Sequence, residues 1–188
     1  MERTYKIELE IPEKVTVIVE KSLVKIKGPK GEVQRDFNYP RIEIEKTDKS
    51  IILKTKKIIK AVQNDKMIIN SYESHINNMF KGALDGYFAK VKVCSGHFPI
   101  QAKLEGNVLQ VKNFLGEKIP RKAVIPAGVK AEVKGDIVEL TGVDKEKVGQ
   151  AAANIEQSTR ITNRDRRIFQ DGCYIILKPG EVQKWNHN

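Results

Sequence analysis

The chain has 188 residues and a formal net charge of +10 at neutral pH, from 34 lysines and arginines against 24 acids. This excess indicates an acidic partner, and nucleic acid is favoured over a membrane surface, because neither helix predicted below pairs a basic face with a strongly apolar one. Only 6% of the residues are aromatic, which argues against stacking of single-stranded bases on aromatic platforms. No apolar run is long enough to span a bilayer, and the N-terminus lacks a signal-peptide pattern.

Residues 14–55 alternate polar and apolar side chains between turn residues, a pattern that predicts an antiparallel meander. The expected strands are residues 15–20, 23–27, 32–37, 41–46 and 50–55. The sequence Gly28-Pro29-Lys30-Gly31 has the spacing of the GxxG loop of KH domains, but that loop joins two helices and this one joins two strands. We therefore predict a hairpin bend, with Lys30 as a weaker candidate for a phosphate contact.

The apolar period then changes from two to about 3.6 residues, which predicts one long helix. Its apolar face carries seven residues: Ile68, Ile69, Tyr72, Ile76, Met79, Phe80 and Ala83. We expect Asn64 or Asp65 to cap its start, and Gly82 and Gly86 to mark its end. A one-sided helix that follows a sheet is expected to cover the apolar face of that sheet, which closes a first domain at about residue 84.

The second half of the chain repeats this organisation. Residues 26–32 parallel residues 111–117, and residues 50–53 parallel residues 136–139. The expected strands are residues 87–94, 100–105, 108–112, 118–125, 129–134 and 137–140, and Asp144 caps a second helix with Val148, Ala151, Ala152 and Ile155 on one face. The prediction is an α+β fold of two tandemly duplicated domains, each an antiparallel sheet with a helix packed on one face. The domains are expected at residues 1–84 and 85–180, and a tail at 181–188 without a pattern is expected to be disordered.

The stretch from Gln157 to Lys178 contains the most concentrated charge. Four arginines lie within eight residues, with one acid among them: Arg160, Arg164, Arg166, Arg167 and Asp165. The stretch leaves the second helix, passes a predicted tight turn at Asp171-Gly172 and enters an apolar run. Arginine on such an anchored connection suits phosphate, because its planar fork donates two parallel hydrogen bonds. A solvated charged loop is the alternative interpretation. Thr162 and Asn163 are expected as neutral donors, and Lys178 as a further charge across the turn.

Three further features carry candidate residues. Phe114 and Leu115 lie at a predicted turn tip, where they either fold back on their own domain or face a partner, and Lys112 and Lys118 flank them. A lysine-rich face in the first half (Lys25, Lys27, Lys30, Arg35) is a weaker second site. His97, close to Cys94, is interpreted as a turn residue or an RNA contact, because neither a second pair of metal ligands nor a group that orients the histidine is evident. The two cysteines, Cys94 and Cys173, are interpreted as buried thiols.

The C-terminal stretch resembles a known family. Gln157, Ile161, Arg164, Arg167, Phe169, Asp171-Gly172, Tyr174-Ile175 and Lys178 occur in the order of the C-terminal signature of large ribosomal subunit protein six, in its archaeal and eukaryotic branch, where eukaryotes call it protein nine. Cys173 departs from the aliphatic residue usual there, although cysteine behaves as a small hydrophobe. The segments from His97 to Ile100 and from Asn113 to Lys118 resemble the same branch, and with the Gly28-Pro29-Lys30-Gly31 turn the resemblance covers about residues 10–180. The resemblance implies two related α+β domains, RNA contact mainly by the second domain, and a position near the sarcin–ricin loop and the translation-factor site.

The prediction from these observations is a structural constituent of the large ribosomal subunit that binds ribosomal RNA, with neighbouring ribosomal proteins as further partners. We expect it in cytoplasmic ribosomes, without a cofactor, metal, membrane or small-molecule substrate. RNA duplexes hide their base edges, so recognition is expected through phosphates, 2′-hydroxyls and shape. No nucleotide-hydrolysis, dinucleotide-binding or serine-hydrolase motif occurs, so no enzyme is predicted. Two alternatives are a free-standing RNA-binding or RNA-chaperone protein and an RNA-modifying enzyme with a site spread over both domains.

Overall fold

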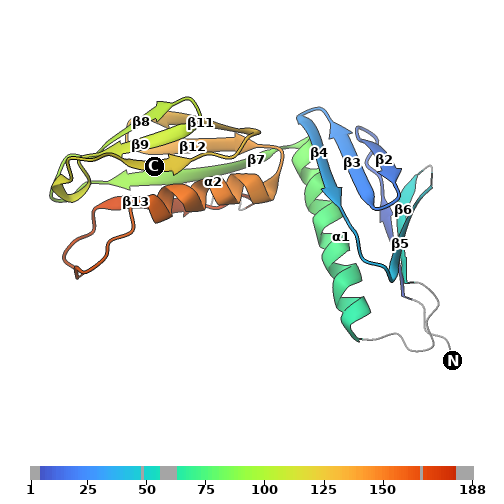
Figure 1. Cartoon of the computed structure of the whole chain (residues 1–188). Helices are drawn as coiled ribbons and strands as arrows, with labels where there is room; N and C mark the ends of the chain where they lie inside the picture. Colours follow the sequence, from blue (N-terminus) through green and yellow to red (C-terminus); the bar gives the residue numbers. More distant parts are fainter. Residues whose placement is uncertain (1–4, 48, 56–62, 166, 181–188) are drawn as a thin grey trace, which may run out of the picture. The chain divides into compact units, whose positions relative to one another are not determined.

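The computed structural model describes residues 5–47, 49–55, 63–165 and 167–180, and it divides the chain into two units, residues 1–86 and 87–188 (Figure 1). Unit 1 contains six strands and a helix: β1 (Lys6–Glu10), β2 (Thr16–Glu20), β3 (Leu23–Gly28), β4 (Gly31–Asp36), β5 (Ile42–Lys46), β6 (Ser50–Thr55) and α1 (Gln63–Leu84). The five predicted strands are present within a residue at each end. Strand β1 was not predicted, although its charged and apolar residues alternate as a half-buried strand requires.

Unit 2 repeats this order and then extends it. It contains β7 (Tyr87–Cys94), β8 (Gln101–Glu105), β9 (Val108–Lys112), the 3₁₀ turn η1 (Phe114–Gly116), β10 (Arg121–Val124), β11 (Val129–Lys134), β12 (Ile137–Gly142), α2 (Lys145–Ser158) and β13 (Gly172–Leu177). Strand β10 is shorter than predicted, because Pro120 lies in the first part of the expected strand and proline cannot donate to a ladder. Asp144 caps α2 as predicted, since its carboxylate accepts a hydrogen bond from the backbone N–H of Glu146 at 2.9 Å.

The strands of each unit are divided between two small antiparallel sheets, which refines the expectation of one sheet. In unit 1 the orders are β2-β3-β4 and β1-β6-β5, and in unit 2 the matching sheets are β8-β9-β10 and β7-β12-β11. A proline lies in every connection that passes from one sheet to the other: Pro12, Pro40, Pro99 and Pro126. Proline fixes φ and lacks an N–H, so it ends a ladder at these points. The duplicated α+β fold is therefore confirmed.

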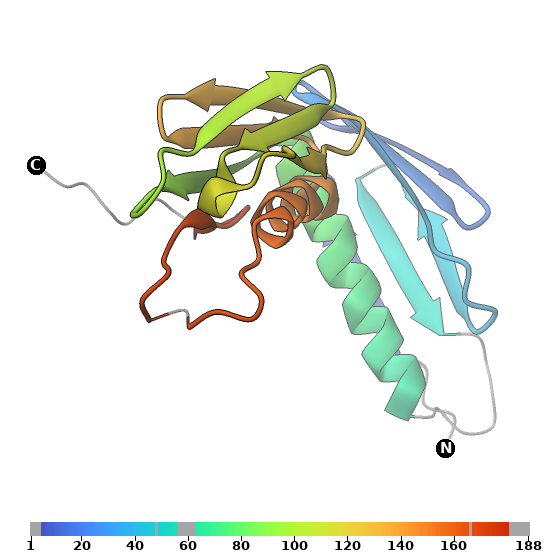
Figure 2. The ribbon, with the colours of Figure 1, turned by 60° about the vertical axis from the view of Figure 1, so that its left-hand side comes forward.

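Strand β13 is the strand of unit 2 that has no counterpart among the described strands of unit 1. It pairs with the free side of β7, in the register Gly172 to Cys94, Cys173 to Val93 and Tyr174 to Lys92. A loop leaves the end of α2 and returns to the start of β13, and Figures 1 and 2 show it at one end of unit 2. The candidate RNA-binding stretch is therefore an addition to the duplicated fold.

Each helix packs against strands of its own unit. Helix α1 contacts β3, β4 and β6 and buries Ile69, Ile76 and Phe80, and α2 contacts β7, β10, β12 and β13 and buries Val148 and Ile155. Neither Asn64 nor Asp65 precedes α1, so the predicted cap was wrong. Both lie inside its first turn, where the buried Asp65 instead accepts a hydrogen bond from the Tyr39 hydroxyl at 3.2 Å. Among the described residues, no helix combines the length and hydropathy that crossing a bilayer requires.

The hairpin at Gly28 to Gly31 joins β3 to β4 as predicted and rests on the end of α1. The backbone N–H of Lys30 donates to the carbonyl oxygen of Ala83 at 3.0 Å, and so satisfies one of the last acceptors of the helix. A Cβ at Gly28 would lie 2.5 Å from that same carbonyl oxygen. Only glycine allows the hairpin to approach the helix this closely.

We expect Gly28→Ala to destabilise unit 1 by roughly 1–3 kcal/mol, the usual cost of forcing an extra methyl group into a packed contact. The same change at Gly149, inside α2, should stabilise by up to about 1 kcal/mol, because alanine favours helix over glycine and the new methyl would lie 3.6 Å from the Pro179 side chain. Urea unfolding followed by circular dichroism measures both. Equal effects of the two changes would contradict the close approach at Gly28.

Candidate nucleic-acid interface

Three connections meet at one end of unit 2. They are the histidine turn (residues 95–99), the phenylalanine loop (residues 113–120) and the arginine loop (residues 159–171). They meet because β7 and β9 both end here, α2 ends here, and β13 begins opposite the last residue of β7. In Figures 1 and 2 the arginine loop projects beside η1 and the turn after β7.

Asp171 fixes the arginine loop where it enters β13. Its side chain is fully buried and accepts three hydrogen bonds, from the backbone N–H of Gly96 at 2.6 Å, the backbone N–H of His97 at 2.9 Å and the Nδ1 of His97 at 2.7 Å. Burial raises the pKa of this carboxyl group, but the hydrogen bonds from His97 and Gly96 outweigh burial and hold the pKa below its ordinary value. Asp171 is therefore a charged anchor between the arginine loop and the histidine turn. No tight turn forms at Asp171-Gly172, so that prediction was wrong.

The two ends of the arginine loop are also joined to each other. The hydroxyl of Thr159 accepts a hydrogen bond from the backbone N–H of Cys173 at 2.9 Å, and Glu156 accepts one from the backbone N–H of Ile175 at 3.2 Å. These two side chains occupy N–H groups of β13. Burial raises the pKa of the Cys173 thiol to about 11, so it stays neutral and packs as an apolar side chain. Cys94 is only half-buried, contrary to the prediction of two buried thiols.

Arg121, the first residue of β10, fixes the other end of the arginine loop. Its guanidinium donates to the carbonyl oxygens of Ser158 at 3.0 Å and Arg160 at 3.2 Å. Two further nitrogens donate to the carboxylate of Glu117 at 2.8 and 2.6 Å, and the guanidinium carbon lies 4.3 Å from the ring centre of Phe114. The hydrogen bond from Arg121 lowers the pKa of Glu117, with burial acting in the opposite direction. In unit 1 the backbone N–H of Lys30 likewise donates a hydrogen bond to a carbonyl group at the end of α1.

The apolar tip of the phenylalanine loop folds back on its own domain. The Phe114 side chain is 1% exposed and lies in its own unit, and Leu115 is half-buried. The amide of Asn113 donates to the carbonyl oxygen of Pro99 at 3.1 Å, and the ring of Phe98 lies 3.6 Å from the Cβ position of Gly116. The loop is thus braced against the histidine turn, and Phe114 is part of the core.

The arginines of the loop have different local partners. The guanidinium of Arg164 lies 4.9 Å from the ring centre of Phe169, and that ring lies 5.0 Å from the ring of His97. Arg167 is exposed and forms an ion pair with Asp165 at 2.7 Å, which lowers the pKa of Asp165. Arg160 is exposed and forms no ion pair with a described residue. The guanidinium groups of Arg160 and Arg164 are therefore exposed to solvent, whereas that of Arg167 is paired with the carboxylate of Asp165 in the same loop.

The structure places most predicted binding residues on these three connections. Eight of them lie there or at the adjacent strand end: His97, Lys112, Lys118, Arg160, Thr162, Asn163, Arg164 and Arg167. Lys30 belongs to unit 1 and is not part of this group. Lys178 follows the far end of β13, roughly 20 Å from the loop at about 3.3 Å per residue, so it does not add charge across the turn. Arg166 lies outside the described residues.

The lysine-rich face predicted in unit 1 is not a single basic surface. Lys25 lies on β3 with its amino group 3.4 Å from the carboxylate of Glu20, and Lys27 pairs across the ladder with Glu32. Arg35 shares the opposite face of β4 with the buried Val33, because side chains alternate along a strand. Acids thus offset the lysines, and the arginine points away from them.

Two anchoring residues were missed as site residues in the sequence. The sequence predicts a turn at Asp171 and no role for Arg121; its local signals are a lone acid before a strand and an arginine between a proline and an apolar strand. Their partners lie far away in sequence: 74 or 75 residues for Asp171, and 37 or 39 for the carbonyl groups that Arg121 contacts. No group of three metal-ligating side chains is found in the described part of the chain.

The comparisons with known proteins agree with this architecture. The family model described as "Ribosomal protein L6" matches residues 11–86 and again residues 98–172, one match in each unit. Three curated relatives from archaea carry the name "Large ribosomal subunit protein uL6". The chain is 44% identical to that of Methanobrevibacter smithii over 91% of this chain and 94% of the relative, and 45% identical to that of Methanospirillum hungatei over 89% and 94%. It is 45% identical to that of Sulfurisphaera tokodaii over 91% of each chain.

Proposed function

The chain belongs to the ribosomal protein L6 family, a family of ribosomal structural proteins and not of enzymes, and on that premise we propose that it binds large-subunit ribosomal RNA through the three-loop end of unit 2. It is a structural component of the large ribosomal subunit, and its place in the cell is the ribosome. Neighbouring ribosomal proteins are its further partners. The observation that carries the proposed site is the arginine loop, which adds exposed guanidinium groups to the duplicated fold and is anchored at both ends by Arg121 and Asp171.

Anchoring at both ends favours binding because less conformational entropy is lost when the loop meets its partner. The proposed phosphate contacts are Arg160, Arg164 and Arg167, with Thr162, Asn163 and His97 as proposed hydrogen-bonding neighbours and Lys112 and Lys118 as additional charges. Arg166 remains a proposed contact from its place in the sequence. Recognition of this kind reads the backbone and shape of folded RNA, since duplex RNA offers little access to its base edges.

The first experiment is sedimentation of the tagged protein from a cell lysate at moderate and then high salt. We expect it to migrate with the large subunit under both conditions. Migration at the top of the gradient would contradict the ribosomal assignment and favour the alternative of a free-standing RNA-binding or chaperone protein. That alternative predicts tight binding to short RNA hairpins without other ribosomal components.

The proposed interface is tested by replacing Arg160, Arg164 and Arg167 with glutamine. Removing one phosphate contact should flatten the slope of log affinity against log salt by roughly 0.7–0.9, so the triple change should reduce it by about 2 to 3. The matched control replaces Lys27, Lys49 and Lys81 of unit 1 with glutamine and removes the same total charge. Equal weakening in both variants would show that bulk charge, and not the arginine loop, drives binding.

The finer placement, near the sarcin–ricin loop and the translation-factor site, is also part of the proposal. Its support is the family signature in the arginine loop. An iron chelate attached at an introduced cysteine in place of Asn163, which is exposed, would generate hydroxyl radicals beside the bound RNA. Cleavage within the sarcin–ricin loop in assembled subunits is the expected result, and cleavage confined to other helices would contradict this placement.

A further inference from the structure

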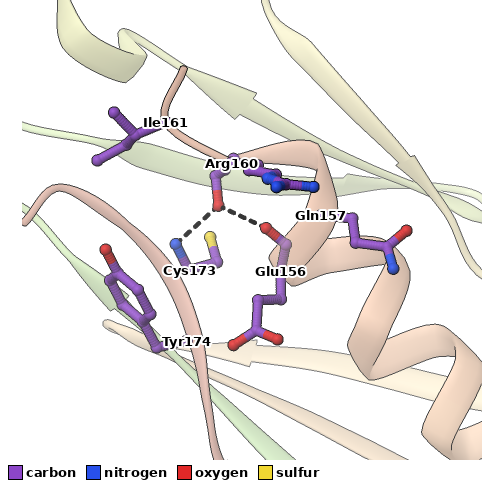
Figure 3. Close-up of a pocket in the computed structure, with 7 residues that line it drawn as sticks. Glu156, Gln157, Arg160, Ile161, Cys173 and Tyr174 are labelled. Carbon is purple, nitrogen blue, oxygen red and sulfur yellow. Dashed lines mark hydrogen bonds between the residues drawn. The ribbon is translucent and has the colours of Figure 1, made fainter. Parts of the chain in front are cut away.

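A pocket of about 340 Å³ opens between the end of α2 and strand β13, at the root of the arginine loop (Figure 3). Seven residues line it: Glu156, Gln157, Thr159, Arg160, Ile161, Cys173 and Tyr174. Figure 3 shows Tyr174 and Ile161 on one side, with Glu156 and Gln157 on the side of the helix. Its volume is at the lower end of the range of small-ligand sites, large enough for one planar ring system.

The pocket combines apolar walls with opposite charges. Ile161 and Cys173 are buried, and the Tyr174 side chain is 40% exposed, so an aromatic surface remains accessible beside an apolar floor. Glu156 and Arg160 both line the pocket but form no ion pair with each other or with any other described residue. A ligand that carries both hydrogen-bond donors and an anionic group would satisfy the two charges together.

We propose that this pocket binds one unpaired nucleotide of the RNA, with guanine as the preferred base; this inference rests on the proposed RNA-binding function. The base stacks on Tyr174, and its phosphate meets Arg160. Guanine has two adjacent N–H donors on its Watson–Crick edge, and a carboxylate is the side chain that accepts two such bonds. One carboxylate offers about four lone pairs, so Glu156 retains acceptors although it already receives the N–H of Ile175.

The position of the pocket supports a nucleotide as its occupant. Arg160 lines the pocket and is also the first arginine of the arginine loop, so an RNA strand whose phosphates follow the loop passes over the opening. Unpaired bases of folded RNA are read in this way, by stacking on an aromatic ring and hydrogen bonding to their edges. Arg121 holds the carbonyl group of Arg160 at 3.2 Å, which keeps this wall of the pocket in place.

The test titrates the full-length, isotope-labelled protein with 5′-GMP, 5′-AMP and inorganic phosphate, and follows backbone amide shifts. GMP should shift the amides of residues 159–161 and 173–175 and bind more tightly than AMP. Replacement Tyr174→Leu should weaken both nucleotides by about tenfold or more, which is the usual effect of losing one stacked base. Equal binding of GMP and AMP, or shifts by phosphate alone that match those of GMP, would overturn the proposal.

Glu156→Gln separates recognition from structure. The glutamine oxygen can still accept the N–H of Ile175, but the side chain now offers one acceptor and one donor, so the preference for GMP over AMP should fall by about tenfold or more. Circular dichroism should show that the fold is unchanged. An unchanged preference in this variant would also overturn the proposal.

Failure of the pocket and failure of the proposed function can be distinguished in ribosomal RNA binding. If Tyr174→Leu and Glu156→Gln bind RNA like the original protein while the arginine variants lose affinity, the pocket proposal is wrong and the interface stands. A photoreactive phenylalanine analogue at position 174, in assembled subunits, should cross-link to RNA. A cross-link to a neighbouring protein instead would identify a protein contact and overturn the nucleotide proposal.

Discussion

Replacing Asp171 with alanine should destabilise unit 2 by roughly 3 kcal/mol, because hydrogen bonds to a charged group are each worth about 1.5–3 kcal/mol, and the exposed donors at Gly96 and His97 regain part of that loss by bonding to water. The backbone N–H groups of Gly96 and His97 and the ring of His97 lose their acceptor together. The arginine loop loses its attachment to the histidine turn in the same step. We therefore expect both a lower free energy of unfolding and faster amide exchange in residues 95–99 and 160–171.

The matched control is Asp136→Ala, which makes the same chemical change at an exposed position between β11 and β12. It should alter the free energy of unfolding by less than about 0.5 kcal/mol, as is usual for surface substitutions. Urea titrations of both variants, followed by circular dichroism, give the comparison. Similar losses in the two variants would show that the three hydrogen bonds of Asp171 contribute little.

The same anchor should weaken in acid. The pKa of Asp171 in the folded protein lies below its ordinary value of 3.8, so the unfolded chain takes up this proton at a higher pH than the folded chain. The stabilisation is therefore complete above the unfolded pKa and is lost as the pH falls through the folded pKa. Asp171→Asn mimics the neutral carboxyl group, so the stability difference between it and the original protein should shrink from pH 7 to pH 3. A constant difference over this range would contradict the assignment.

Much of the fold was predictable because its signals are local. Strands β2 to β6 and β7 to β12 follow an apolar alternation that is broken by glycine and proline, and α2 begins where Asp144 supplies its cap. The sequence also contains a signal for the division into two sheets, since a proline lies in each of the four connections that lead from one sheet to the other. This signal cannot be interpreted without the strand pairing, because a proline in a connection does not indicate the sheet to which the next strand belongs.

The charged residues of the candidate site could be predicted from the sequence, but the residues that anchor its loops could not. The exposed arginines could be recognised from their density and from the family resemblance, since arginine on an anchored loop suits phosphate whatever surrounds it. Asp171 and Arg121 could not, because their roles arise from backbone groups that chain folding brings from distant segments. The same holds for Phe114. Its sequence does not indicate whether the ring packs in its own domain or faces a partner, because that depends on how its loop packs. The prediction for Lys178 was wrong for a different reason. Lys178 is close to the arginine loop in sequence, but the extended strand β13 separates the two in space.

Replacing Arg121 with methionine should lower the free energy of unfolding of unit 2 by roughly 2 kcal/mol. Two hydrogen bonds to the carbonyl groups of Ser158 and Arg160 are removed, at about 1 kcal/mol each, and the cation–π contact with Phe114 adds a fraction to about 1 kcal/mol at a partly exposed position. Methionine retains much of the apolar volume of the arginine stem, so part of the packing on Phe114 survives and limits the loss. Thermal and urea unfolding measure the change.

A matched control separates the fork of Arg121 from its charge. Lys122→Met removes a positive charge from the next residue of β10, where the side chain is exposed, and should have almost no effect on stability. Arg121→Lys keeps the charge but cannot reach two carbonyl groups and a carboxylate at once, so it should fall between the methionine variant and the original protein. Amide exchange in residues 158–162 should rise in the same order. If Arg121→Lys matches the original protein in both measurements, charge alone holds the start of the arginine loop, and the geometry of the guanidinium is not required.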